Sequence, residues 1–99
     1  TRAGVAVRPA PTVWSPLEYA CHVRDVLRVF DARVRLMLTQ DGPAFANWDQ
    51  DETAVTERYG EQDPAGVAVE LRAAGEALAA TFAAVPPDRL PDLSWESTF

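Results

Sequence analysis

The stretch WSPLEYACHVRD, residues 14–25, decides how this chain folds. It carries strong signals for the start of a helix. Ser15 can cap the free backbone N–H groups, and Pro16 stands at the first helical position, where its missing N–H is not needed. Glu18 follows Ser15 by three residues and completes a capping box. The sequence therefore predicts a helix over residues 16–40, which an Asp-Gly-Pro turn ends.

Apolar side chains recur along this predicted helix at helical spacing. They form one stripe: Tyr19, Val23, Val26, Leu27, Phe30, Val34 and Met37. The charged side chains fall on the opposite side: Arg24, Arg28, Asp31 and Arg35. We expect that side to be a solvated face with an ion pair between Asp31 and Arg35. His22 lies at the margin of the stripe, where a side chain can face both the core and a cavity.

Two further helices are predicted downstream. The acidic run at residues 49–52 is interpreted as the cap of a short, solvated helix that continues to Tyr59, with Gly60 as its stop. An Asp-Pro pair then opens a second long helix over residues 63–84, which two prolines end. Its apolar stripe consists of Val67, Leu71, Ala74, Leu78, Phe82 and Val85.

The fold class predicted from these patterns is all-α. A chain of 99 residues forms one domain at most. Residues 1–13 have no clear period and are interpreted as an extended leader, and residues 14–99 as a partial helical bundle. Two long helices and a short one leave their flanks uncovered within one chain. We therefore expect either a homodimer or a piece of a larger bundle.

Composition narrows the functional classes. The chain carries 9 basic and 15 acidic residues, a net charge of -6, which argues against nucleic-acid binding and gives no support for binding to anionic membranes. Cys21 is the only cysteine, so no intrachain disulfide is possible, and a reducing cytoplasm is the expected compartment. We see no signal peptide and no apolar run long enough for a bilayer.

His22 is the only histidine and the first candidate for metal chemistry. A metal site needs three or four converging donors, and the nearest possible one is Glu18, for which the capping role is favoured. Cys21 is adjacent to His22, but neighbours on a helix point about 100° apart, so the two cannot form a dyad. Cys21 is therefore interpreted as a small residue for helix packing.

Residues 14–25 resemble the W-S-x-x-E-Y-x-x-H-v-R-D stretch of actinobacterial DinB-like proteins, relatives of the mycothiol-dependent maleylpyruvate isomerases. The likeness continues in DGPAF at residues 41–45, NWDQD at residues 47–51 and RYGEQDP at residues 58–64. It covers residues 13–89 and includes loop residues that packing alone would not fix.

The resemblance implies a four-helix bundle that holds a divalent metal, nickel or zinc, near one end. One of three ligands is a histidine matched here by His22, and the other two come from the last bundle helix. Relatives use the metal to activate a low-molecular-weight thiol for transfer or isomerisation. The small-molecule substrate is not identified by the sequence.

This sequence departs from the family pattern, because no histidine follows His22. SWES at residues 94–97 resembles the start of the ligand-bearing last helix, and no counterpart of the first bundle helix precedes Thr1. We expect a chain truncated at both ends. It is a fragment, a degenerate member without metal, or a protein in which two copies rebuild the bundle.

The sequence therefore predicts a DinB-like metal-binding protein that is not catalytic as this chain alone, and it leaves open whether the protein is an enzyme. The alternative is a non-catalytic helical protein that acts by self-association or by binding a partner, with His22 as a relic.

Overall fold

The computed structural model describes residues 2–40, 45 and 47–92 of the chain. Within these residues the fold is all-α, as predicted, and the one extended pairing is an isolated bridge between Ala10 and Val13. The α-helices are α1 (Arg2–Val5), α2 (Pro16–Thr39), α3 (Gln50–Thr56) and α4 (Pro64–Ala83). Two 3-10 helices are η1 (Tyr59–Glu61) and η2 (Pro87–Asp92).

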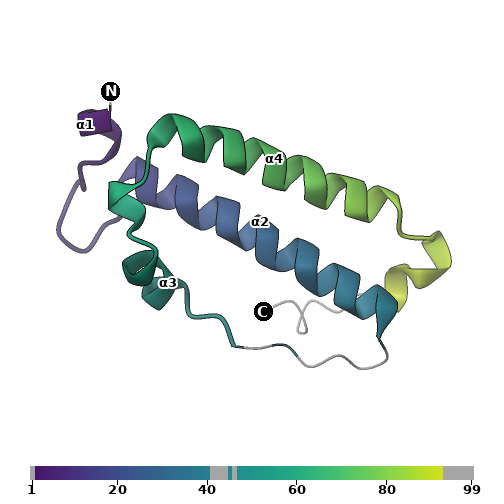
Figure 1. Cartoon of the computed structure of the whole chain (residues 1–99). Coiled ribbons are helices and arrows are strands. Elements are labelled where there is room, and N and C mark those ends of the chain that lie inside the picture. The colour runs from purple at the N-terminus through teal and green to yellow at the C-terminus, as the bar shows by residue number, and fades with distance from the viewer. Residues whose placement is uncertain (1, 41–44, 46, 93–99) are drawn as a thin grey trace.

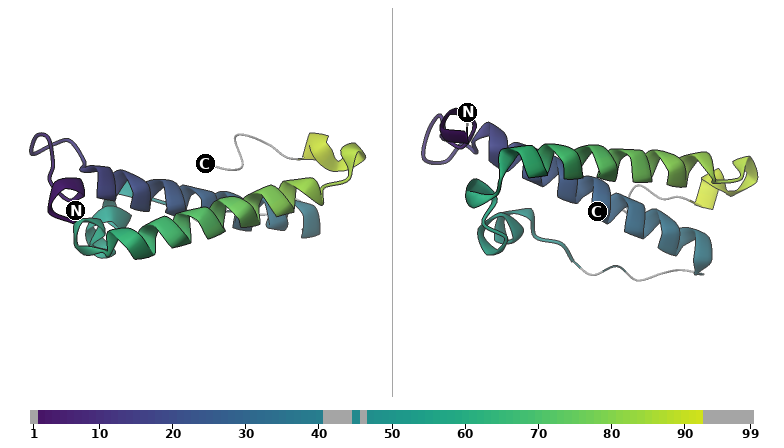
Figure 2. Two further views of the ribbon diagram at one scale, coloured as in Figure 1. Left: turned by 90° about the horizontal axis from the view of Figure 1, so that it is seen from above. Right: turned by 45° about the horizontal axis from the view of Figure 1, so that its top comes forward.

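The two long helices, α2 and α4, lie side by side and run in the same direction (Figures 1 and 2). A parallel pair needs a long return connection, and here α3 and η1, which lie by the start of α2, come before α4 in the chain (Figure 1). Both long helices therefore start at the same end of the molecule. That end also holds α3 and η1, whereas η2 lies near the far end of α2.

Local capping explains where each helix begins. The Ser15 side chain accepts a hydrogen bond from the Glu18 N–H at 3.2 Å, and the Glu18 carboxylate accepts one from the Ser15 N–H at 3.1 Å, so the predicted capping box of α2 is confirmed. Asp49 caps α3 by accepting bonds from two backbone N–H groups, and Asp63 caps α4 through the Gly66 N–H at 2.9 Å.

The short helix ends earlier than predicted. It was expected to continue to Tyr59, but α3 ends at Thr56 and Arg58 takes a left-handed conformation with a φ of 51°. The chain then forms η1 as a separate turn. The segment expected to be an extended leader also differs, because it contains the one-turn helix α1.

The buried face of α2 is only partly the predicted stripe. Val34 and Met37 are buried, but Tyr19 and Val23 are 52% and 45% exposed. Arg24, which was assigned to the solvated side, is only 4% exposed. The buried side chains of α2 are Leu17, Glu18, Cys21, Arg24, Arg33, Val34 and Met37.

A helical wheel identifies faces but cannot say which of them α4 and the loops will cover, and α4 covers the side that carries Cys21 and Arg24. On α4 itself, Val67 and Ala74 are buried as predicted, as is Val85 just beyond its end. Phe82 is 45% exposed and its neighbour Thr81 is buried in its place.

Two apolar clusters hold α2 and α4 together. The first lies at the shared starting end and consists of Leu17, Cys21, Ala54, Tyr59 and Val67. The second lies at the far end and consists of Val34, Met37 and Val85. No helix in the described part of the chain is both long and apolar enough to span a bilayer. The SWES motif at residues 94–97 lies outside the described residues.

Candidate functional site

His22 lies half-buried on the second turn of α2, between two tryptophan rings. Its ring centroid is 5.1 Å from that of Trp14, with a tilt of 59°, and 6.0 Å from that of Trp48, with the two planes only 3° apart. Tyr19 meets Trp14 edge-on, with a centroid distance of 5.5 Å. Aromatic contacts thus join α2 to the segment before it, through Trp14, and to the segment before α3, through Trp48.

A pocket of about 280 Å³ opens beside this aromatic group. Its lining consists of Thr12, Trp14, Tyr19, His22, Gln50 and Asp51. The start of α3 supplies Gln50 and Asp51, because the Asp49 cap fixes the first turn of α3 near this pocket. The pocket combines an imidazole, a carboxylate, an amide and a hydroxyl with two aromatic walls, which suits a small polar ligand or a cation.

Among the described residues, one atom of His22 lacks a hydrogen-bond partner. Nδ1 is buried, and no hydrogen-bond partner for it exists within the described part of the chain. Most buried polar atoms in proteins are hydrogen-bonded, and each exception calls for an explanation such as a bound ion or water.

Glu18, the other donor considered from the sequence, is fully engaged elsewhere. Its two carboxylate oxygens accept hydrogen bonds from Arg8 at 2.8 and 2.6 Å, in addition to the capping bond from Ser15. The Arg8 guanidinium, aided by the Ser15 N–H, lowers the pKa of this nearly buried carboxyl to about 2. The predicted capping role of Glu18 is therefore confirmed.

Cys21 points away from the histidine, as the helical geometry predicts. Its side chain is fully buried in the cluster at the starting end, and its thiol donates a long hydrogen bond to the Tyr59 carbonyl, with an S···O distance of 3.8 Å. Burial raises the pKa of this thiol above its usual value. The packing role predicted for Cys21 is confirmed.

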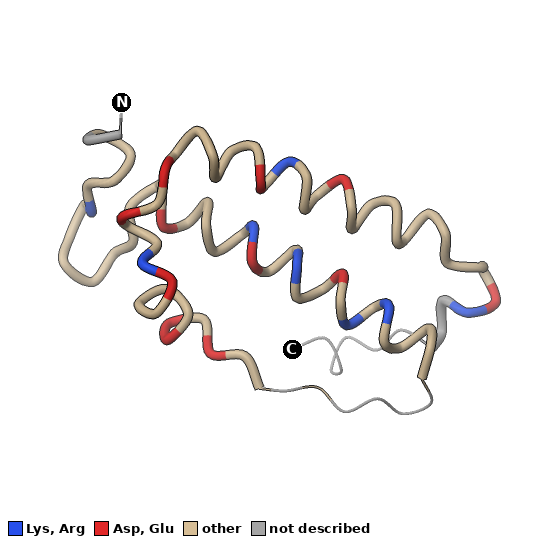
Figure 3. Tube along the Cα trace, in the orientation of Figure 1, with Lys and Arg blue, Asp and Glu red and all other residues tan. Residues whose placement is uncertain are grey.

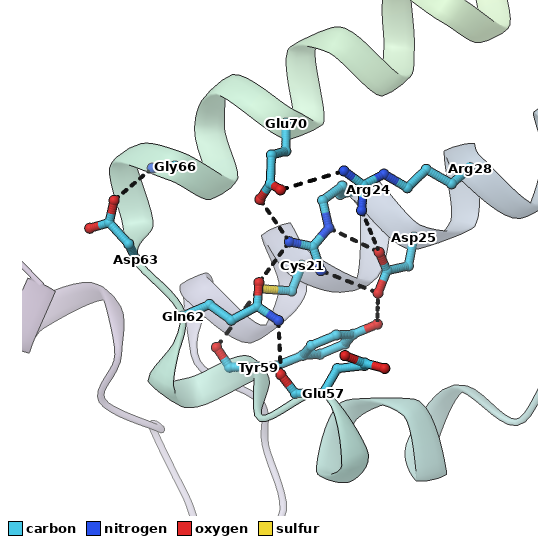
Figure 4. A network of polar contacts seen from close by, with 10 residues as sticks. All are labelled: Cys21, Arg24, Asp25, Arg28, Glu57, Tyr59, Gln62, Asp63, Gly66 and Glu70. Atoms are coloured by element: carbon cyan, nitrogen blue, oxygen red, sulfur yellow. Dashed lines mark hydrogen bonds and ion pairs between the residues drawn. The ribbon is translucent and has the colours of Figure 1, made fainter.

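A polar network is centred on the buried side chain of Arg24 (Figure 4). Arg24 donates to the Gln62 side chain at 2.7 Å, to Glu70 on α4 at 3.1 Å and to Asp25 at 2.9 Å. The Tyr59 hydroxyl donates to the same Asp25 carboxylate. Three elements, α2, η1 and α4, are thus joined by one arginine and its acceptors, which explains why this arginine is buried.

Sequence reasoning missed Asp51 as a pocket residue, because an acidic run at the start of a helix predicts only a cap and a solvated face. Three aromatic residues outside the helices lie in different places. Trp14 lines the pocket and Trp48 stacks on His22, whereas Phe45 lies under Arg33 at 5.2 Å, beside the far-end cluster. Acidic residues gather around α3 and η1, and both signs alternate along α2 (Figure 3).

Comparison with known proteins supports one assignment. No curated protein and no solved structure matches the chain. The family model described as the DinB superfamily matches residues 1–97, nearly the whole sequence. The resemblance carried by the helix around His22 and by the loops after it is therefore confirmed at the level of the family. The chain belongs to the DinB superfamily.

Proposed function

We propose that this protein binds a divalent metal ion, nickel or zinc, and that His22 supplies one of the ligands. The observation that carries the proposal is the buried Nδ1 of His22, which has no hydrogen-bond partner among the described residues. An unpaired buried polar atom costs about 1–3 kcal/mol, and a cation can take the lone pair of a neutral imidazole. Asp51 lines the same pocket, and carboxylates also bind zinc.

The described residues fit part of such a site. They contain no group of three His, Cys, Asp or Glu side chains arranged to hold a metal ion, and a complete site needs three or four donors. Further donors would come from residues outside the described ones or from a second chain. We therefore propose metal binding for this chain and no catalysis by the chain alone.

The chemistry that a metal would supply here is activation of a thiol, because a bound cation lowers the pKa of a thiol and makes its thiolate available. Cys21 does not suit this role, since it is buried and bonded to the Tyr59 carbonyl. The reactant would be a low-molecular-weight thiol from solution, used for transfer or isomerisation. Trp14 and Tyr19 would wall the pocket that holds this reactant.

Metal content of the purified chain after loading with nickel or zinc tests this proposal. We expect the wild type to retain metal, His22→Ala to lose it and Asp51→Asn to bind it more weakly. Asp88→Asn is the matched control, because it makes the same charge change at an exposed residue of η2, away from the pocket. Wild-type protein without metal, or a His22→Ala variant that binds equally well, would contradict the proposal.

A second proposal is self-association, which the outer side of α2 favours. Tyr19 and Val23 are 52% and 45% exposed, and Val26 and Phe30 on the same side of the helix are half-buried. The radius of gyration of the chain is 15.6 Å, compared with about 13 Å for a compact domain of this length. An apolar side on an elongated helix pair is suited to a second copy of the chain.

Sedimentation velocity at micromolar concentration measures this directly. We expect a dimer for the wild type and a monomer for Val23→Glu, which places a charge within the apolar side. Val69→Glu is the matched control, since Val69 is exposed on α4. A wild-type protein that sediments as a stable monomer would rule out self-association and leave the metal proposal standing.

A further inference from the structure

Tyr59 stands between the polar network and the His22 pocket. It is completely buried, its hydroxyl donates to Asp25 and its carbonyl accepts from the Cys21 thiol. Its ring meets Trp14 edge-on, with centroids 6.3 Å apart and planes at 78°. Trp14 in turn lies 5.1 Å from His22. A continuous series of contacts thus leads from the Asp25 carboxylate to the imidazole.

The turn that carries Tyr59 has an unfavourable backbone conformation. Arg58 immediately before it has a φ of 51°, which a residue with a side chain rarely adopts. Hydrogen bonds hold this turn in place. The Gln62 side chain donates to the Glu57 carbonyl at 2.9 Å, and Arg24 holds the same Gln62 at 2.7 Å (Figure 4).

The Asp25 carboxylate is fixed independently of Tyr59. Arg24 contacts both of its oxygens, at 2.9 and 3.3 Å, and also lies over the Tyr59 ring, 5.9 Å from its centroid. The Asp25 carboxylate, which accepts the bond from the Tyr59 hydroxyl, therefore has a fixed position on α2, three residues after His22. This bond ties the Tyr59 ring, which contacts Trp14, to a carboxylate on α2.

We propose that the Asp25–Tyr59 hydrogen bond is a positioning contact that fixes Trp14 against His22 and thereby sets the orientation of the imidazole for its ligand. Tyr59 does not line the His22 pocket, so it acts through Trp14 as a positioning residue. The consequence for metal affinity rests on the proposed function above. Contacts outside the ligand shell commonly change metal affinity about 10- to 100-fold.

The test uses the fact that His22 is the only histidine, so its ring protons give unique proton NMR signals. Two neighbouring tryptophans shift these signals by their ring currents. In metal-free Tyr59→Phe, which keeps the buried ring and removes the hydroxyl, we expect the signals to move towards their unfolded position. We also expect the zinc dissociation constant to rise about tenfold.

Thr81→Val is the matched control. It removes another hydroxyl that donates to a carboxylate, that of Asp31, at the far end of the same helix pair. It should lower the thermal unfolding midpoint and leave both the His22 signals and the zinc affinity unchanged. Asp25→Asn provides a second variant if Tyr59→Phe does not fold, and should move the His22 signals in the same direction.

This design distinguishes a failure of the positioning role from a failure of the metal proposal. His22 signals that stay in place in both Tyr59→Phe and Asp25→Asn, or that move equally in Thr81→Val, would overturn the positioning role. Wild-type signals that do not respond to zinc would overturn the metal proposal instead. Because the first comparison uses metal-free protein, the positioning role is decided whether or not zinc binds.

Discussion

Arg24 and Arg28 lie one turn apart on α2 and contact the same two carboxylates, Asp25 and Glu70. The two arginines differ in how far their side chains are exposed to solvent. The Arg24 side chain is only 5% exposed and its contacts measure 2.9 and 3.1 Å. The Arg28 side chain is 51% exposed and its contacts measure 3.7 and 3.6 Å. Substitutions of these two arginines therefore separate the effect of burial on stability from the effect of charge.

We predict that Arg24→Met lowers the free energy of unfolding by about 3–5 kcal/mol, because it removes a buried guanidinium together with its ion pair to Asp25 and its hydrogen bond to Gln62. Arg28→Met should cost less than about 1 kcal/mol, as solvent-exposed ion pairs contribute little. Urea unfolding followed by circular dichroism measures both. Equal losses of unfolding free energy in the two variants would mean that the contacts of the buried Arg24 stabilise the fold no more than those of the exposed Arg28.

Glu18 should make stability depend on pH. Its pKa is lowered to about 2 by the bond from Arg8, so the folded state holds this proton less tightly than the unfolded chain does. Its contribution is therefore complete above about pH 5 and is lost as the pH falls towards 2. Glu18→Gln keeps an oxygen for the Ser15 N–H and loses the charge.

The prediction is that the unfolding midpoint of Glu18→Gln falls less steeply between pH 5 and 2 than that of the wild type. Thermal scans over this range measure it, with Glu76→Gln as the control, because the ion pair of Glu76 with Arg72 lies at an exposed site on α4. Parallel pH curves for wild type and Glu18→Gln would show that the Arg8 contact does not stabilise the fold.

At the scale of the elements, the turn between α3 and η1 carries the one positive φ of a residue other than glycine among the described residues, at Arg58. Its side chain is exposed and its pair with Glu61 is long, at 3.7 Å. Arg58→Gly should therefore raise stability by up to about 1 kcal/mol. Glu57→Gly, at a φ of -89°, is the control and should lower it. A loss in Arg58→Gly would show that this turn is not strained.

Helix boundaries were accessible to sequence reasoning because capping is local. The ends of α2 and α4 lie within a residue or so of those predicted, as Ser15, Asp63 and their prolines act on neighbouring backbone. The buried face of α2 was not accessible in the same way. Arg24 is buried because Gln62 and Glu70, some 38 and 46 residues away, supply its acceptors. A helical wheel contains no such information.

The candidate site likewise contains one residue that the sequence identifies and others that only the fold brings near it. His22 was identified from the sequence because it is the single histidine in a family motif. Asp51 and Trp48 were not assigned to it, since their nearness to His22 depends on how the chain returns to the start of α2. Tyr59 was read only as the end of a short helix, whereas it connects the polar network to Trp14.

At the scale of the whole molecule, the parallel arrangement puts the starts of α2 and α4 at one end (Figure 2). The pocket lies at this end, since residues at the starts of α2 and α3 line it. Helix N-termini carry partial positive charge, which stabilises nearby carboxylates. Such charge favours the acidic residues that gather at this end (Figure 3). The same end combines the histidine, the aromatic walls and the polar network, and it is where a ligand would bind.

The most direct test of the central claim, that His22 is a metal ligand, is a zinc titration of the full chain followed through the unique His22 ring signals in proton NMR. We predict that both ring signals shift and then stop changing as the site fills, and that a chelator restores them. Signals that stay in place at zinc concentrations well above that of the protein would contradict the claim and leave His22 a packing residue between Trp14 and Trp48.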